Sequence, residues 1–469
     1  MTAGENKTLA TAESSRCPEI AHRQCVCISP IAVCLVVFCV SLLSFLQAAH
    51  HRGILWAPPE NGGDEDSYER IGYNLAAGLG FGNCPCDDPI VAGLEEPQPT
   101  ERCAPNCSPD DFETTAYRPP GFPFLIAAVN LIDPLNFAMI RIINCMFCAA
   151  GVAIVALFLA RQDQTPAALL MGLTCSIDPR LREFAGTYLT ENMATLACSL
   201  FVVALAIFAD RKNLLSAAFC GFALTALVFI RSFYVAWYPV IWILVAIVLF
   251  RNRLNSGSNR RPWLLTLAVF CVASLTLTLP WWIRNCVVLE SLMPTGTQGG
   301  IGIADGFSDS AWDAYGSWTP QTANQIAVQI RQDPATENLH GIAFEKEHCR
   351  QGSAAAMTWI QQHPDKLLTL TWWKFSRLWE AGSRWHPFLF AATAIGLFVS
   401  RRNSFAKVTL LLLILNSFTV IATYHTYERF LTPLRPVIHA FAAIGIVSTW
   451  SMVRTVFNYR GQPKHQKFR

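Results

Sequence analysis

The stretch IAVCLVVFCVSLLSFLQAA, residues 31–49, contains no charged side chain. A helix of roughly 20 such residues crosses the hydrocarbon core of a bilayer. Further apolar stretches follow at about residues 136–160, 166–177, 187–209, 214–230, 234–250, 263–283, 388–399, 408–424 and 436–453. Irregular backbone cannot face lipid, so each stretch is expected to be helical, and those at 166–177 and 388–399 are short enough to be half-helices. The sequence therefore predicts an all-α membrane protein, a multi-span helical bundle with about ten or more transmembrane helices.

The composition of the 469-residue chain agrees with a membrane protein. Charged residues make up 15% of it, against roughly 25% in soluble globular proteins, and 52% of the residues are hydrophobic. A single soluble chain of this length has too little interior to bury so much apolar surface. Soluble, disordered and fibrous classes are therefore excluded. The net charge is only +3, and it does not arise from a basic patch. The charge therefore indicates no nucleic-acid partner.

The basic residues of the short loops predict the orientation. Most of them, such as Arg251, Arg253, Arg401 and Arg402, fall on the side of the N-terminus. The positive-inside rule then makes both termini cytoplasmic. We expect a cytoplasmic tail over residues 1–30, a transmembrane domain over 31–453 and a basic cytoplasmic tail over 454–469. A cleaved signal peptide is the alternative for the first stretch, but the uncharged run of residues 24–49 exceeds the roughly 7–15 residues of a signal core.

Two long segments, at about residues 50–135 and 284–387, become large extracytoplasmic loops in this orientation. Loops of this length inside a bundle are usually functional or hold structure of their own. We therefore expect an integral protein of the plasma (inner) membrane, with its active site facing the extracytoplasmic side.

Four cysteines of the first loop, Cys84, Cys86, Cys103 and Cys107, differ from those in the apolar stretches. They form C-P-C and C-A-P-N-C in a compartment expected to be oxidising, which favours disulfides. Four thiolates also suit a tetrahedral zinc ion, although these spacings are not the common ones, and free thiols are the third possibility. The connectivity is left open.

The same loop contains two charged motifs. Asp64, Glu65 and Asp66 begin an amphipathic helical pattern that includes Tyr68, and acids in a first helical turn are favoured by the helix dipole. A plain acidic helix cap is the structural alternative. Farther on, YRPPGFP at residues 117–123 holds Arg118 in a stiff extended segment. A rigid arginine beside a membrane suits a phosphate.

A second group of charged residues lies at the predicted outer ends of the spans. Its members are Glu191, Arg231, Arg284, Glu428, Arg429 and Arg435. Interfacial anchoring explains any one of these arginines. Together they are expected to frame an outward-facing polar cavity, with cations for an anionic ligand and carboxylates for proton chemistry.

The motifs resemble those of a known superfamily. They are D-E-x-x-Y at 64–68, L-x-x-G-x-G-F at 75–81, R-P-P-G-F-P at 118–123, L-T-E-N at 189–192, P-W-W-I-R-N at 280–285 and Y-E-R-F-L-T-P-L-R-P at 427–436. In this order they resemble GT-C integral-membrane glycosyltransferases, in particular the protein mannosyltransferase and aminoarabinose lipid A transferase branch (glycosyltransferase family 39-like). The resemblance extends from about residue 64 to residue 446.

The resemblance implies an activity and site residues. Such enzymes transfer a sugar from a polyprenyl-phosphate donor to an acceptor hydroxyl of a glycolipid, polysaccharide or protein. Matching positions imply that Asp64 is the base, that Glu65 is its neighbouring carboxylate and that Arg118 meets the donor phosphate. Further phosphate candidates are Arg284 and Arg429, and other site candidates are Tyr68, Tyr117 and Glu191.

No cofactor is predicted, although carboxylates beside a phosphate are able to hold a divalent cation. The expected partners are the polyprenyl-phosphate sugar donor, a glycan, lipid or protein acceptor, and membrane lipids. Two alternatives remain. A multi-span transporter would carry its charges near the bilayer midplane rather than at helix ends. A non-catalytic lipid-linked-saccharide binding protein would not need the Asp64 carboxylate.

Overall fold

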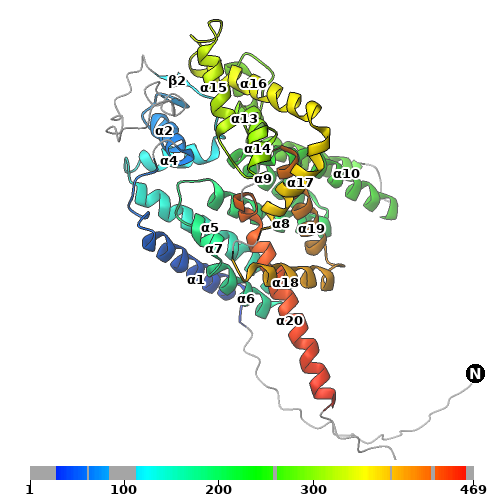
Figure 1. Ribbon diagram of the computed structural model, residues 1–469. Helices are drawn as coiled ribbons and strands as arrows, with labels where there is room; N and C mark the ends of the chain where they lie inside the picture. Colours follow the sequence, from blue (N-terminus) through cyan, green and yellow to red (C-terminus); the bar gives the residue numbers. More distant parts are fainter. Residues whose placement is uncertain are drawn as a thin grey trace, which may run out of the picture.

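A computed structural model describes residues 28–60, 63–83, 112–256, 261–380, 383–423 and 428–460. Figure 1 shows a mostly helical chain. The helices are α1 (Pro30–His51), α2 (Asp64–Ala76), α4 (Gly121–Asn130), α5 (Phe137–Arg161), α6 (Thr165–Ser176), α7 (Pro179–Phe184), α8 (Glu191–Arg211), α9 (Leu214–Ile230), α10 (Trp237–Ser256), α11 (Arg261–Leu275), α12 (Thr278–Val288), α13 (Gln298–Gly306), α14 (Asp309–Asp313), α15 (Gln321–Gln332), α16 (Gly341–Gln362), α17 (Pro364–Leu378), α18 (His386–Val399), α19 (Ser404–Thr423) and α20 (Arg435–Arg460).

Five short elements complete the described chain. The 3₁₀ turns are η3 (Ser232–Ala236), η4 (Glu428–Phe430) and η5 (Thr432–Leu434). The strands β1 (Gly82–Asn83) and β2 (Glu113–Thr114) pair antiparallel, with Gly82 opposite Thr114. Cys84, Cys86, Cys103 and Cys107 lie outside the described residues, so their disulfides remain a prediction.

Six described helices, or helix pairs joined end to end, are long and apolar enough to span a membrane. They are Pro30–His51, Phe137–Arg161, Glu191–Arg211, Ser232–Leu254, Ser404–Thr423 and Thr432–Phe457. The prediction of a helical integral membrane protein is confirmed, but a count of ten or more full spans is not. All ten predicted stretches contain helix, but α6, α9 and α18 have only 12, 17 and 14 residues, and α11 and α12 form one pair bent by 50°.

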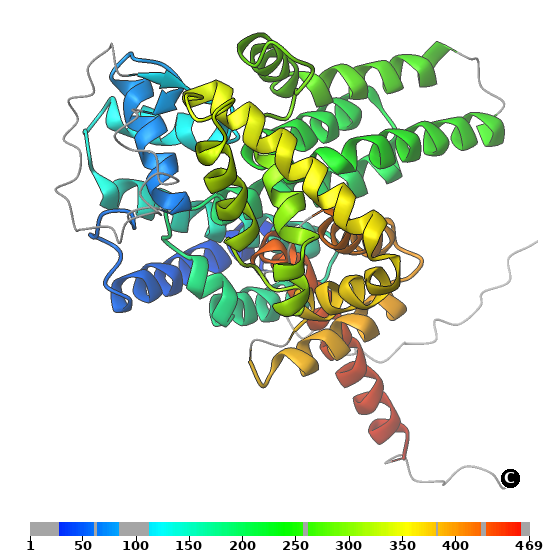
Figure 2. The ribbon, with the colours of Figure 1, turned by 45° about the horizontal axis from the view of Figure 1, so that its top comes forward.

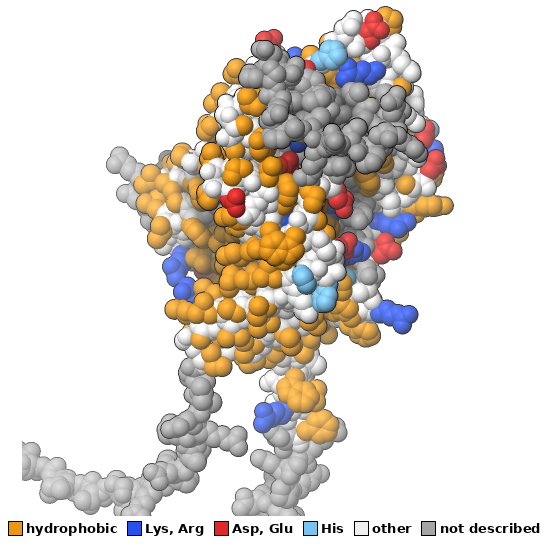
Figure 3. Space-filling model, turned by 90° about the vertical axis from the view of Figure 1, so that its left-hand side faces the viewer, with side chains coloured by type: hydrophobic (Ala, Val, Ile, Leu, Met, Phe, Trp, Pro, Cys, Tyr) orange, Lys and Arg blue, Asp and Glu red, His pale blue; other side chains and the backbone are white. Residues whose placement is uncertain are grey.

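The surface of the bundle is apolar where it would meet lipid. Helix α1 alone exposes Ile31, Leu35, Val36 and Leu43. In Figure 3, apolar side chains form a broad area across the lower half of one face, and acidic and basic side chains are more frequent above it. Such continuous apolar exposure is expected of a surface whose solvent is the bilayer.

Close helix contacts hold the C-terminal half of the bundle together. Gly396 of α18 and Gly445 of α20 face the other helix, and a Cβ atom added at Gly396 would collide with the Phe441 carbonyl oxygen. Small residues at such crossings let membrane helices approach closely. We expect a larger side chain at either glycine to separate α18 from α20.

A buried polar cluster ties the start of α20 to α7. The carboxylate of Asp178 accepts hydrogen bonds from Arg435 Nη1 at 2.7 Å and from His439 Nε2 at 3.0 Å, and it caps the N-terminus of α7. Arg435, expected at the outer polar cavity, instead lies in this cluster and is buried. The cluster anchors the chain directly after η4 and η5.

The two long segments between spans meet at one end of the bundle. Figures 1 and 2 place α2, α13, α15 and α16 together there, away from α1, α6 and α20. Glu345 of α16 joins the segments, because its carboxylate accepts hydrogen bonds from Ala116 N at 3.0 Å and from Thr297 Oγ1 at 3.1 Å. The segments thus form one cap over the ends of the helices.

Lys374 of α17 is buried in this cap, and no described acidic side chain forms an ion pair with it. Its side chain is 0% exposed, its Nζ atom lies 3.6 Å from the centroid of the Phe307 ring, and no described residue is its hydrogen-bond partner. Burial lowers the pKa of Lys374 to about 7. Since an unfolded lysine titrates near pH ~10.4, the unfolded chain binds the proton more tightly, and stability should rise between pH 7 and 10.

We therefore expect Lys374→Met to stabilise the protein by roughly 2–4 kcal/mol at pH 7 and to remove this pH dependence. The measurement is the melting temperature of the full chain in nanodiscs at pH 7 and pH 9. Lys366→Met is the control, because the Lys366 side chain is 28% exposed. A lower melting temperature in Lys374→Met at both pH values would contradict the expectation.

Candidate active site

A cavity of about 230 Å³ lies where the cap meets the ends of the helices. Segments far apart in the sequence contribute to its wall. The lining residues are Asp64, Tyr68, Tyr117, Arg118, Pro119, Leu189, Thr190, Glu191, Arg231, Ser232, Phe233, Gln298, Ile301, Gly302, Asp305, Trp318, Pro320, Ala323, Asn324, His348, Arg429 and Phe430. The cavity thus collects six of the eight site residues predicted from the sequence.

Asp64, the first residue of α2, is bound on both oxygens by arginines. Its Oδ1 atom accepts a hydrogen bond from Arg118 Nη2 at 2.7 Å, and its Oδ2 atom accepts one from Arg429 Nη1 at 2.9 Å. Burial would raise the pKa of Asp64, but the two guanidinium groups outweigh it and hold that pKa well below its usual range. Asp64 is therefore a carboxylate between two cations.

Arg118 is held in place by more than Asp64. Its side chain is 7% exposed, its Nε atom donates to Ser67 Oγ at 3.1 Å, and its guanidinium carbon lies 5.0 Å and 4.8 Å from the ring centroids of Tyr68 and Tyr117. Burial raises the pKa of Tyr117 to about 12, so its hydroxyl stays neutral. The local sequence explains this rigidity, because Pro119 follows and restricts the backbone of Arg118.

A second acidic residue continues the row of charges. Glu191, the first residue of α8, is 1% exposed, and its Oε1 atom accepts a hydrogen bond from Arg231 Nη1 at 2.8 Å. Arg429 Nε lies 3.8 Å from the same oxygen. The charges therefore run Arg118, Asp64, Arg429, Glu191 and Arg231, three cations and two anions. This excess of one positive charge suits an anionic ligand.

Two predicted site residues lie outside the cavity lining. Glu65 accepts a hydrogen bond from Tyr188 N at 2.8 Å and lies 3.4 Å from Arg141 Nη2. Arg284 donates to the Thr115 carbonyl oxygen at 2.7 Å, three residues before Arg118. In the structure both residues brace the segments that carry the cavity residues.

The lining also contains residues of the second long segment that the motifs did not identify. Asp305 of α13 is 5% exposed, its Oδ1 atom accepts a hydrogen bond from Ala323 N at 3.1 Å, and burial raises its pKa to about 7. His348 Nε2 lies 2.9 Å from the Ala323 carbonyl oxygen. An aspartate in the glycine-rich run GGIGIADG, residues 299–306, was the available sequence signal. The cavity therefore holds two carboxyl groups of very different acidity, Asp64 and Asp305.

The acids of the cavity do not resemble a metal site. Within the described ranges, no three His, Cys, Asp or Glu side chains are grouped so that they could hold a metal ion. Asp64 and Glu191 both face guanidinium groups, and such a set of donors suits a phosphate.

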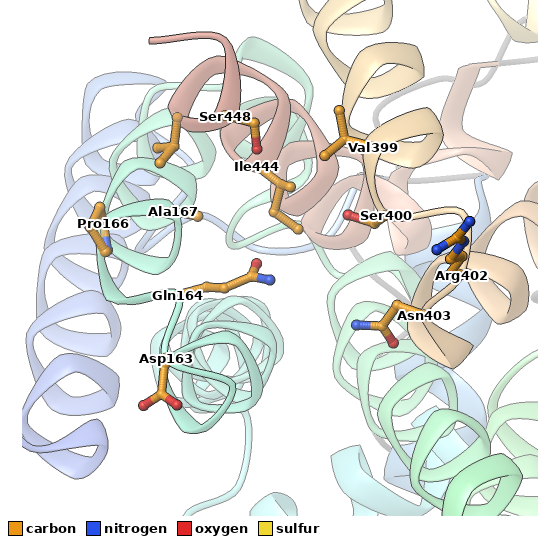
Figure 4. A pocket seen from close by; sticks show the side chains of 11 residues that line it. Asp163, Gln164, Pro166, Ala167, Val399, Ser400, Arg402, Asn403, Ile444 and Ser448 are labelled. Atoms are coloured by element: carbon orange, nitrogen blue, oxygen red, sulfur yellow. The ribbon is translucent and has the colours of Figure 1, made fainter. Parts of the chain in front are cut away.

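A larger pocket, of about 510 Å³, lies between the α5–α6 turn, the α18–α19 turn and α20. Figure 4 shows Gln164 reaching into it and Asp163 pointing away from it. One further charged residue, Arg402, belongs to its lining. This pocket shows no paired acids and bases like those around Asp64.

No protein family and no curated protein sequence matches the chain. Among solved structures, it is similar to the apo oligosaccharyltransferase of Archaeoglobus fulgidus, with 11% identity, a TM-score of 0.49 and coverage of 93% of this chain and 53% of that chain. It is also similar to ArnT from Cupriavidus metallidurans bound to undecaprenyl phosphate, with 15% identity, a TM-score of 0.37 and coverage of 93% and 80%. The chain thus spans about half the length of the archaeal enzyme.

Proposed function

We propose that this protein transfers a sugar from a polyprenyl-phosphate donor to an acceptor hydroxyl at the extracytoplasmic face of the plasma membrane. The observation that carries the proposal is the Asp64 carboxylate between Arg118 and Arg429 in a cavity beside the helix ends. This arrangement brings a carboxylate, which can serve as a base, together with two guanidinium groups. The planar guanidinium fork is suited to binding phosphate oxygens.

The arginines supply the electrostatic part of the reaction. When the bond between the sugar C1 atom and the phosphate oxygen breaks, the electron pair stays on the phosphate. Arg118 and Arg429 lie where they can stabilise that charge, and preorganised donors of this kind lower a barrier by about 3 kcal/mol each. A phosphate that leaves with this help needs no strong general acid.

The acceptor hydroxyl requires a base. Its oxygen attacks C1 while its proton passes to Asp64, so that one C–O bond forms, one breaks and the charge ends on the phosphate. A positioned base contributes about 10²- to 10⁴-fold to the rate. Gln298, Asp305 and Asn324, which also line the cavity, offer polar atoms to a hydroxyl-rich sugar or acceptor.

The test uses the purified full chain in nanodiscs. We expect it to bind undecaprenyl phosphate and to release that lipid from undecaprenyl-phosphate-linked sugars when an acceptor-containing membrane extract is added. Binding without release would support the alternative of a non-catalytic binding protein. Absence of both binding and release would reject the proposal.

The proposed sidedness has a separate test. Reporter fusions after Arg253 and after Lys407 are expected to report cytoplasm, because basic loops stay inside. A fusion at Gln325, in the cap beside the cavity, should report the outside. A cytoplasmic signal at Gln325 would place the cavity in the wrong leaflet for an extracytoplasmic transfer.

A further inference from the structure

The arginines that would bind the donor phosphate are already occupied. Both oxygens of Asp64 accept hydrogen bonds from them, from Arg118 at 2.7 Å and from Arg429 at 2.9 Å. A carboxylate bound in this way is a poor base, because a proton would have to replace two strong ionic contacts. The site therefore holds both of its functional groups in an unproductive pairing.

We propose that Asp64 is a displaceable counter-ion: the donor phosphate takes its place on Arg118 and Arg429, and only the displaced carboxylate accepts the proton of the acceptor hydroxyl. This inference rests on the proposed function and adds an order of events to it. Donor binding must precede activation of the acceptor.

The charge balance of the cavity supports the exchange. In the described ion pairs, Arg118, Arg429 and Arg231 face two carboxylates, Asp64 and Glu191, so this row has one more positive than negative charge. A sugar-linked polyprenyl phosphate is a phosphodiester with a single negative charge, which brings the row to neutrality. Phosphate oxygens also match the planar guanidinium fork, whereas a carboxylate shared between two arginines uses one oxygen on each.

The arginines have other contacts that would keep them in place. Arg118 retains Ser67 Oγ at 3.1 Å and the rings of Tyr68 and Tyr117. Arg429 retains Glu191 at 3.8 Å. The Asp64 side chain is 31% exposed, against 7% for Arg118 and 26% for Arg429, so it is the least enclosed of the three. Displacement thus requires movement of one short side chain while both cations remain.

The consequence is unusual for a residue of an active site. Removing the Asp64 carboxylate should make the site bind phosphate better while it destroys transfer. If Asp64 merely positioned the arginines, its removal would weaken binding instead. The sign of the change in affinity therefore distinguishes a competitor from a positioning residue.

The experiment measures undecaprenyl phosphate binding to the full chain in nanodiscs of neutral lipid. We expect Asp64→Asn and Asp64→Ala to bind at least about tenfold more tightly than the unmodified protein, the scale of losing one charge-assisted contact. Asp64→Glu keeps the charge and should not tighten binding. The use of two neutral variants keeps the test decisive if one of them folds poorly.

Asp66→Asn is the matched control. It removes the same charge two residues along α2, where Asp66 faces Arg70 at 2.9 Å and lies outside the cavity lining. Any gain in phosphate affinity in Asp66→Asn measures the long-range effect of removing one negative charge. Only the additional gain in Asp64→Asn reports competition between Asp64 and the phosphate for the arginines. The displacement would be overturned if the unmodified protein binds undecaprenyl phosphate but the neutral Asp64 variants bind it no more tightly than Asp66→Asn does. The proposed function would still stand in that case. Failure of every form to bind would reject both.

Discussion

Asp64→Asn is expected to lower the rate of sugar transfer by about 10²-fold or more, equivalent to roughly 2.7 kcal/mol in the barrier. The amide keeps the shape of the side chain but cannot accept the proton of the acceptor hydroxyl. The measurement is release of undecaprenyl phosphate from a radiolabelled sugar donor at saturating donor concentration. Saturation separates the loss of the base from any change in donor affinity.

The outcome also tests the identity of the base. Asp66→Asn is expected to retain transfer, because its carboxylate faces Arg70 rather than the cavity. Full transfer by Asp64→Asn would remove Asp64 from this role. Asp305, whose pKa of about 7 already suits proton exchange, would then be the next carboxyl group of the cavity to test.

Arg118→Ala is expected to weaken undecaprenyl phosphate binding by about 10- to 100-fold and to lower transfer as well. Hydrogen bonds to charged groups contribute about 1.5–3 kcal/mol, and this arginine meets the phosphate both before and during bond cleavage. Equilibrium binding and single-turnover transfer would be measured on the same nanodisc preparation. Binding and turnover should fall together, unlike in Asp64→Asn.

Arg350→Ala is the control for the loss of one positive charge, since Arg350 is an exposed residue of α16 paired with Glu347. Its undecaprenyl phosphate affinity should stay within about twofold of the unmodified protein, because exposed pairs contribute little. Equal affinities in Arg118→Ala and Arg350→Ala would mean that the phosphate does not bind at Arg118.

Most helices of the bundle could be predicted from the sequence. Lipid permits no unpaired backbone polar groups, so an uncharged apolar run such as residues 31–49 has one structural solution. The number of helices that span the membrane completely could not be predicted in this way. Whether α6 or α18 crosses a membrane, and whether α11 and α12 bend by 50°, depends on the helices packed around them.

The candidate site also has parts that the sequence predicted and parts that only the folded structure showed. Asp64 and Arg118 could be predicted because both belong to short motifs of one loop. Their pairing with Arg429, 365 residues from Asp64 along the chain, follows only from the folded structure. Asp305 was missed because an isolated aspartate acquires its unusual pKa from burial, which no local motif encodes.

The sequence by itself determined the membrane class, the positions of the helical segments and the basic and acidic groups available to a site. These properties depend on the transfer free energies of side chains and on local backbone preferences. Only the tertiary structure decided that Asp64 faces the arginines while Glu65 turns to Tyr188 and Arg141. Adjacent residues on a helix point about 100° apart, so packing of α2 against the bundle selects which of the two carboxylates enters the cavity.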